Sequence, residues 1–189
     1  MARGLFALLI FAVAALLSGC AMKPTATQDS IDGLTAAILA LGPGIDPEEA
    51  AEASRIAHLY SLELAQAYGI TDAPLIHNDK VIRGERERGL CNHWAEDLSA
   101  RLAQEHFRTL SLHRAISPPG PLRIIHHTVV ISKRGGTMEE GIVLDPWRKG
   151  GTLTWALVVK DTHYTWKPRN DVVKQLLEAE ERRKAAHPA

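Results

Sequence analysis

A cysteine, a histidine and an acidic residue follow one another along this chain in an order that suits amide chemistry. Cys91 comes first, His127 second and Asp145 third. A thiolate can attack a carbonyl carbon, an imidazole can exchange protons with the thiol and the leaving amine, and a carboxylate can orient the imidazole. We therefore take Cys91 as a candidate nucleophile, His127 as its base and acid, and Asp145 as the partner of the histidine.

The surroundings of Cys91 predict that it begins a helix. Gly89 interrupts the chain just before it, and Trp94 and Leu98 then recur at helical spacing. The first turn of a helix offers free N–H groups and the positive end of the helix dipole, and both favour a thiolate. A thiol buried in the core is the alternative interpretation of the same position.

Two neighbouring histidines compete for the role of base. The side chains of His126 and His127 must point to opposite faces of a strand. His127 shares its face with Val129 and Ile131, the more apolar set, and that face is expected to pack against the helix. We choose His127 for this reason. Asp145 ends the next strand, where its carboxylate can accept a hydrogen bond from an imidazole N–H. The alternative is that Asp145 helps to form a turn.

The elements that must position these residues divide into helices followed by strands. The pattern predicts an α+β fold in which two or three N-terminal helices pack on a small, four-stranded antiparallel β-sheet. The apolar residues keep helical spacing up to Ser117, except over one stretch of charged residues that is typical of a solvated loop. The predicted helices cover 34–41, 47–69 and a region starting at 91, and the loop covers 70–89. The predicted strands cover 123–132, 141–145, 153–159 and 164–166. A charged helix is predicted over 172–183.

The N-terminal segment has the features of a bacterial lipoprotein signal. Arg3 precedes an apolar run that is shorter than a membrane span, and small residues lead to Cys20. We expect a signal peptide over 1–19, with lipidation of Cys20 and a tether over 20–30. A single domain over 31–183 and a flexible tail over 184–189 follow. An uncleaved membrane anchor is the alternative.

Composition excludes several classes of protein. The chain has 22 basic and 22 acidic residues, so net charge gives no attraction to nucleic acid. Two cysteines are too few for a disulfide scaffold or an all-cysteine metal site. Zinc bound by Cys91, His93 and His127 is an alternative, but no motif has the usual spacing of zinc ligands. We expect neither a metal nor a cofactor.

Three short motifs resemble the transglutaminase-like cysteine peptidases, within the wider papain-like group. Cys91-Asn92-His93-Trp94-Ala95 is similar to that family's nucleophile helix, His127-Thr128-Val129-Val130 to its histidine strand, and Val143-Leu144-Asp145-Pro146 to its acid strand. The likeness covers the region from Gly89 to about Trp166. It implies an enzyme that cleaves amides or transfers acyl groups with the triad Cys91, His127 and Asp145.

Two further parts of such a site are less defined in the sequence. Papain-like enzymes commonly place a glutamine shortly before the cysteine to stabilise the oxyanion, and here that stretch offers Glu85 and Arg86 instead. Asn92 and Asn78 are candidate oxyanion donors. Trp94 and Trp147 are candidates for the substrate groove, although core packing is the more ordinary role of a tryptophan.

These features together predict a thiol-dependent amide hydrolase or acyltransferase held in the bacterial cell envelope. Because Ala21 rather than an aspartate follows Cys20, we expect a lipid anchor in the outer membrane, facing the periplasm. The expected substrate is a protein or peptide, such as an envelope protein or the peptide part of peptidoglycan. The alternative is a non-catalytic lipoprotein of the same fold that binds a partner.

Overall fold

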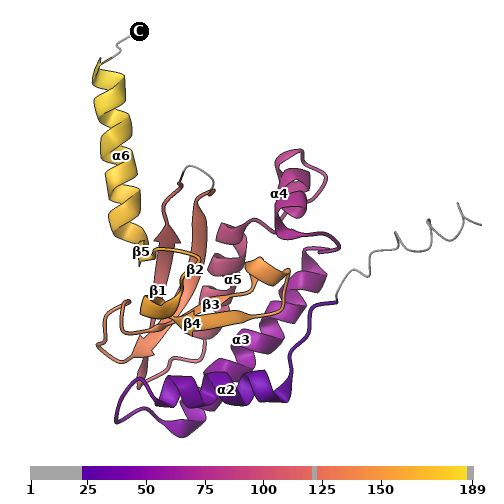
Figure 1. The fold of residues 1–189 in the computed structure, drawn as a ribbon, viewed down its shortest axis with the longest axis vertical. Coiled ribbons are helices and arrows are strands. Elements are labelled where there is room, and N and C mark those ends of the chain that lie inside the picture. The colour runs from indigo at the N-terminus through magenta and orange to yellow at the C-terminus, as the bar shows by residue number, and fades with distance from the viewer. Residues whose placement is uncertain (1–22, 121–122, 187–189) are drawn as a thin grey trace, which may run out of the picture.

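In the computed structural model, a group of helices lies against one face of a single antiparallel sheet, and most of these helices precede the sheet in the chain (Figure 1). The structure describes residues 23–120 and 123–186. The expected signal peptide and Cys20 lie outside these ranges. The described helices are α2 (Gln28–Leu39), α3 (Pro47–Ala67), α4 (Pro74–Ile82), α5 (Cys91–Ala103) and α6 (Arg169–Ala186).

The sheet has five strands in the order β4-β3-β2-β1-β5, and every pair is antiparallel. The α+β prediction is therefore confirmed, with one strand more than expected. The strands are β1 (Leu110–Ser117), β2 (His126–Lys133), β3 (Ile142–Asp145), β4 (Thr154–Leu157) and β5 (Lys167–Pro168), with two short 3-10 turns at η1 (Trp147–Lys149) and η2 (Val158–Lys160).

Strand β1 corrects the expectation of helix up to Ser117. It lies in the sheet between β2 and β5 and pairs with β2 along its whole length. The edge strand expected at 164–166 is also displaced, because β5 falls at Lys167–Pro168 and pairs with β1. The sequence did not reveal β1 because its burial is irregular, with a partly buried stretch in the middle. This pattern lacks the strict alternation of buried and exposed residues by which a strand is recognised in sequence.

Helix α4 corrects the expectation of a loop over 70–89. Pro74 occupies its first turn, a position that proline favours. The helix reverses the usual pattern of burial, because its buried residues are the polar His77 and Asn78 while Leu75 and Ile82 are exposed. Hydrophobic periodicity therefore could not reveal it.

Helix α5 packs on β2 and β1, and α3 packs on α5 and α2 (Figure 1). The apolar face of β2 contributes Val129 and Ile131 to this core, which Ala95 and Leu98 of α5 complete. The opposite face of the sheet carries a smaller cluster that includes Val130, Val143, Val158 and Trp166. The prediction that the Val129 face packs against the helix is thus confirmed.

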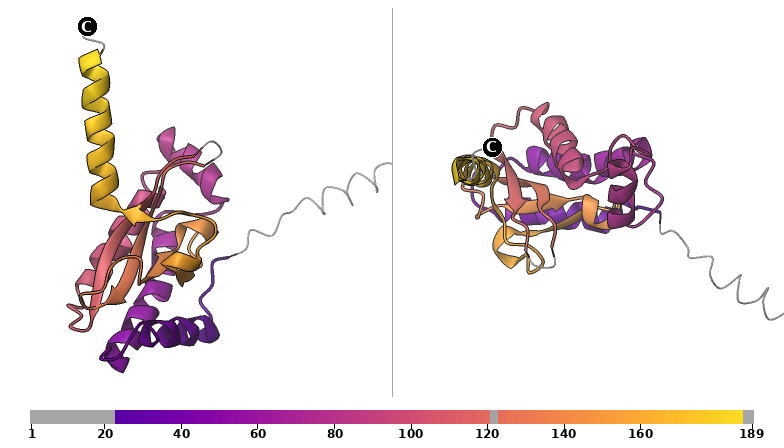
Figure 2. Two further views of the ribbon diagram at one scale, coloured as in Figure 1. Left: turned by 60° about the vertical axis from the view of Figure 1, so that its left-hand side comes forward. Right: turned by 90° about the horizontal axis from the view of Figure 1, so that it is seen from above.

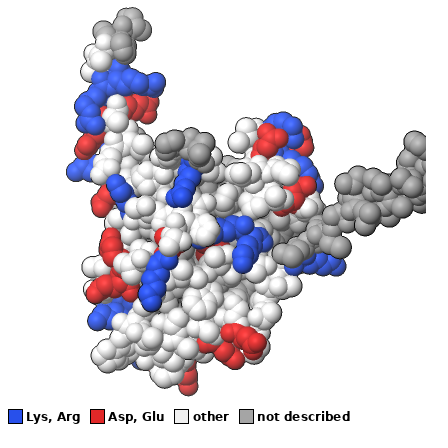
Figure 3. All heavy atoms as spheres, viewed as in Figure 1, with Lys and Arg blue, Asp and Glu red and all other residues white. Residues whose placement is uncertain are grey.

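The two ends of the described chain behave differently. Thr27 caps α2, and the Thr25 N–H donates a hydrogen bond of 2.9 Å to Thr152 Oγ1. The expected tether is therefore helical from Gln28 onward and attached to the domain before that. Helix α6 starts at the sheet and stands away from it, with acidic and basic side chains along its length (Figures 2 and 3). No helix in the described ranges is both long enough and apolar enough to span a bilayer.

Candidate active site

Cys91 lies at the first position of α5, as the sequence predicts. Gly89 permits this placement, because its φ of +128° is strained for other residues. A Cβ at position 89 would also lie only 2.3 Å from His77 Nε2. Cys91 is 6% exposed, and its Sγ lies 3.7 Å from the carbonyl oxygen of Ile125. The sulfur is therefore level with the start of β2.

The histidine that joins the site is His126, and the expectation of His127 is wrong. His126 Nε2 lies 2.6 Å from Asp145 Oδ2, and both side chains are fully buried. The register pairs Val129 with Leu144, so Asp145 falls on the same face as His126 and on the face opposite to His127. His127 does face the helix side, as expected, but Asp145 does not.

His126 interacts with both Asp145 and Cys91. Nε2 is bound to the carboxylate, while Nδ1 is buried and forms no hydrogen bond within the described residues. Burial alone would lower the pKa of His126, but the charge and hydrogen bond of Asp145, together with the nearby thiol of Cys91, raise it to about 9. The ring is therefore cationic at neutral pH, with Nδ1 left as the nitrogen that can exchange a proton with sulfur.

Three aromatic rings enclose the imidazole. The centroids of Trp147, Tyr164 and Trp166 lie 4.7, 4.5 and 5.4 Å from that of His126. They pack against the ring and shield it from bulk solvent, and their electron-rich faces favour a cation. This enclosure strengthens the interaction of His126 with Asp145, because a local environment of low polarity screens charges poorly.

Arg148 joins the same carboxylate from the other side. Its Nε donates to Asp145 Oδ2 at 2.6 Å, and its two terminal nitrogens bind Asp161. Asp161 also accepts a hydrogen bond of 2.9 Å from Trp166 Nε1. Burial opposes the charge of Asp161, but the bonds from Arg148 and Trp166 lower its pKa below the ordinary value. The buried site therefore contains two carboxylates and one guanidinium behind the imidazole.

Asn78 is the better placed of the two oxyanion candidates. Its Oδ1 accepts a hydrogen bond of 3.1 Å from Trp147 Nε1. Because an indole N–H can only donate, this bond fixes the orientation of the amide and leaves the Nδ2 protons for another acceptor. Asn78, Asn92 and Cys91 all line one cleft. The first N–H groups of α5 have no partner within the helix and add further donors there.

The cleft beside Cys91 has a volume of about 380 Å³. His127 lines it, whereas the tryptophans expected in a groove do not. Trp94 is 1% exposed and donates to the carbonyl of Gly89 at 2.9 Å, so it belongs to the core. Trp147 is also buried and contacts His126 from behind. The residues that line the cleft are Leu75, Asn78, Asp79, Ile82, Leu90, Cys91, Asn92, Ile124, Ile125 and His127.

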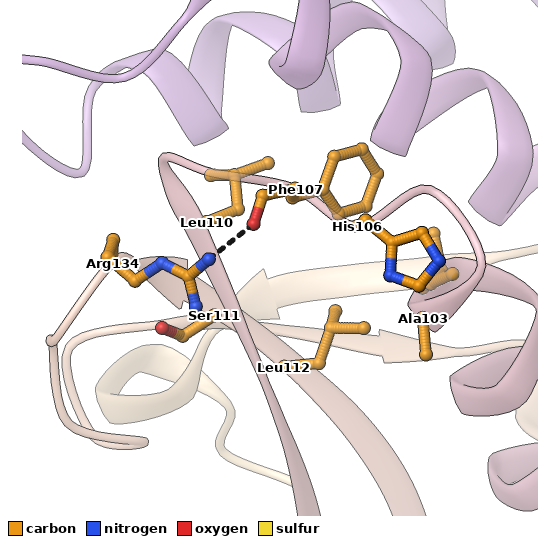
Figure 4. Close-up of a pocket in the computed structure, with 8 residues that line it drawn as sticks. Ala103, His106, Phe107, Leu110, Ser111, Leu112 and Arg134 are labelled. Atoms are coloured by element: carbon orange, nitrogen blue, oxygen red, sulfur yellow. Dashed lines mark hydrogen bonds between the residues drawn. The ribbon is translucent and has the colours of Figure 1, made fainter.

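A second pocket lies at the other end of α5 (Figure 4). Its main polar group, Arg134, donates to the backbone carbonyls of Phe107 and Arg108 at 2.6 and 3.0 Å. The guanidinium thus joins the residue after β2 to the segment before β1 rather than facing a ligand. As for metals, the described residues contain no group of three or more histidine, cysteine, aspartate or glutamate side chains that could hold an ion.

Comparison with protein-family models, curated proteins and solved structures gave no match to this chain. The likeness to transglutaminase-like peptidases therefore remains a prediction from three short motifs. The candidate site depends on its own geometry: Cys91 at a helix start, a buried His126–Asp145 pair, and Asn78 at the shared cleft.

Proposed function

We propose that this protein is a thiol-dependent amide hydrolase that uses Cys91, His126 and Asp145. The observation that carries the proposal is the 2.6 Å bond between two fully buried side chains, His126 and Asp145. The other ring nitrogen of His126 has no partner among the described residues, and the thiol of Cys91, at a helix start, is near enough to contribute to the raised pKa of the ring. A buried, charged pair of this kind costs stability, and its position beside a nucleophile supports a chemical use.

Each residue has a defined part in the proposed reaction. The Cys91 thiolate attacks the amide carbon, and the carbonyl oxygen takes the negative charge. Asn78 Nδ2 and the free N–H groups at the start of α5 stabilise that oxygen. His126 Nδ1 then gives its proton to the leaving amine, the C–N bond breaks, and a thioester remains on sulfur. His126 then takes a proton from water, the resulting hydroxide attacks the thioester carbon, and the C–S bond breaks. This step releases the carboxylic acid and restores the Cys91 thiolate and the His126 imidazolium.

A non-catalytic binding module is the second candidate, and the low exposure of Cys91 favours it. Cys91 is only 6% exposed, so a substrate can reach the sulfur only through the cleft. A core thiol would show the same exposure without reacting. The two functions differ in how fast Cys91 is alkylated in the folded protein.

The expected cellular setting belongs to the proposal as well. The lipobox-like segment ending at Cys20 supports a lipid-anchored protein in the bacterial cell envelope, at the outer membrane and facing the periplasm. A substrate would then be an envelope protein or the peptide part of peptidoglycan. Amide hydrolysis and acyl transfer share the thioester, so transfer to an amine uses the same residues.

Alkylation by iodoacetamide at pH 7 tests the proposal in the full chain. The tryptic peptide 89–101 reports modification of Cys91 separately from Cys20. An ordinary thiol is only a few per cent thiolate at this pH, so a thiolate paired with His126 should react at least about tenfold faster than free cysteine. His126→Ala should remove this advantage.

Two variants serve as controls for the histidine. His113 is a partly buried histidine on β1 that bonds to Ser132 Oγ at 2.8 Å, away from Cys91, and His113→Ala should leave the rate unchanged. His127→Ala should lower the rate less than threefold. Slow alkylation that is insensitive to His126→Ala would favour the binding module. An equal loss in the variants at 126 and 127 would reject His126 as the partner of the sulfur.

A further inference from the structure

The cleft beside Cys91 has a polar centre between apolar ends. On α4, Leu75, Asn78 and Ile82 are spaced by three and four residues and therefore lie on one face of the helix. The candidate oxyanion donor Asn78 thus has an apolar side chain about one turn away on either side. Ile124, which precedes β2, also lines the cleft.

These apolar side chains are not covered by the protein. Leu75 is 61% exposed, Ile82 is 76% exposed and Ile124 is 45% exposed. Single exposed apolar residues are ordinary, but three that line one cleft next to a nucleophile mark a surface that a ligand would cover.

The polar groups in the cleft give little attraction to a charged ligand. Burial, Arg114 and His126 lower the pKa of His127 to about 4, so its ring is neutral at pH 7. Asp79 is the one acidic residue among the lining residues, and Arg83 pairs with it at 3.1 Å. An apolar group therefore suits this cleft better than a carboxylate or an ammonium group.

The two sides of the nucleophile also differ. Cys91 and Asn78 line the cleft, but His126 does not. The leaving amine takes its proton from His126 and so must lie on the His126 side. The cleft is then left for the other half of the substrate, which stays on sulfur as the acyl group.

We propose that the cleft between α4 and Ile124 binds an apolar side chain on the acyl side of the scissile amide, so that the substrates are peptides with a leucine-like residue there. This inference rests on the proposed hydrolase function. It predicts discrimination between substrates that differ only in the acyl-side residue.

Acetyl-leucine and acetyl-aspartate chloromethyl ketones test the inference on the full chain. Sγ displaces chloride in both reagents, and intact-peptide mass spectrometry follows the adduct on peptide 89–101. Each rate constant is divided by the rate of the same reagent with glutathione, which removes differences in intrinsic reactivity. The leucine reagent should react at least tenfold faster, a factor equal to about 1.4 kcal/mol. Leu75→Ser and Ile82→Ser should each reduce this ratio at least threefold.

Ile76→Ser is the matched control. Ile76 lies on the same helix and is 55% exposed, but it does not line the cleft, so this variant should keep the full ratio. Because the readout is a ratio, an equal loss of thiol reactivity with both reagents cancels.

The possible failures can be separated. Fast, His126-dependent alkylation by iodoacetamide with a leucine-to-aspartate ratio near one would overturn the inference and leave the hydrolase proposal standing. A high ratio that neither cleft variant reduces would place the apolar subsite elsewhere and overturn the assignment. Slow alkylation by iodoacetamide would overturn the hydrolase proposal itself, together with the inference that rests on it.

Discussion

Asp161 does not touch Cys91 or His126, yet its charge should influence how firmly His126 holds a proton. The carboxylate neutralises Arg148, which binds the same Oδ2 atom of Asp145 as His126 does. In Asp161→Asn the guanidinium loses the negative charge that balances it. Its positive charge then repels the imidazolium more strongly, so the pKa of His126 should fall. In Arg148→Gln two carboxylates remain near the ring, and the pKa should rise.

The size of the shift follows from Coulomb's law. Hydrogen bonds link Asp161 to His126 through Arg148 and Asp145, so we take the two charges to be roughly 8 Å apart. At an effective dielectric constant of about 20, two unit charges at that separation interact by about 2 kcal/mol. That energy corresponds to about 1.5 pKa units, and movement of Arg148 toward solvent should reduce it to about one unit. We therefore expect the pKa of His126 to move from about 9 to about 8 in Asp161→Asn. It should move upward in Arg148→Gln, because Arg148 shares Asp145 Oδ2 with His126.

An NMR titration of the histidine rings measures both shifts. The chain has nine histidines, and the signal that disappears in His126→Gln identifies the one of interest. Lys160→Gln is the control, because it removes an exposed charge next to Asp161 in the chain and should move the pKa by less than about 0.3 units. Simple loosening of the site would bring the pKa toward that of a solvated imidazole in both variants. Shifts of the same sign would therefore refute the reasoning.

Two further predictions concern the cleft. Asn78→Asp keeps the acceptor for Trp147 Nε1 but removes the Nδ2 donors, so hydrolysis of an acetyl-leucine anilide should fall by about 10²–10³-fold in kcat; an unchanged kcat would exclude Asn78 from the oxyanion site. His127 binds a proton less readily in the folded chain than in the unfolded chain, since its pKa is lowered to about 4, and stability should therefore be lost as pH falls from about 6.5 toward 4. After discounting for partial exposure, this loss is about 1–2 kcal/mol. Urea unfolding at pH 7 and pH 4.5 should show a smaller acid loss in His127→Gln than in the natural chain, and equal losses would contradict the assignment.

The sequence revealed those parts of the site that depend on local signals. Gly89 and the spacing of Trp94 and Leu98 predicted a helix starting at Cys91, and the structure confirms it. The position of Asp145 at the end of a strand is also confirmed. Helix α4 was not visible in this way, because it buries His77 and exposes Leu75 and Ile82, which line the cleft.

Asp161 and Arg148 show a second limit of sequence patterns. They lie 13 residues apart and meet through the fold of the segment between them, so no spacing rule connects either one with His126. The enclosure of the ring by Trp147, Tyr164 and Trp166 arises in the same way.

The choice between the two histidines separates what the sequence determined from what the fold decided. Alternation along β2 by itself placed His126 and His127 on opposite faces, and hydrophobicity correctly assigned the His127 face to the helix. The partner of Asp145 depended on the register between β2 and β3, which the long connection between these strands leaves open in the sequence. Pairing of Val129 with Leu144 sets that register. The start of α5 lies beside the first residue of β2, and this position brings the sulfur to the histidine on the other face. A shift of one residue would have exchanged the two.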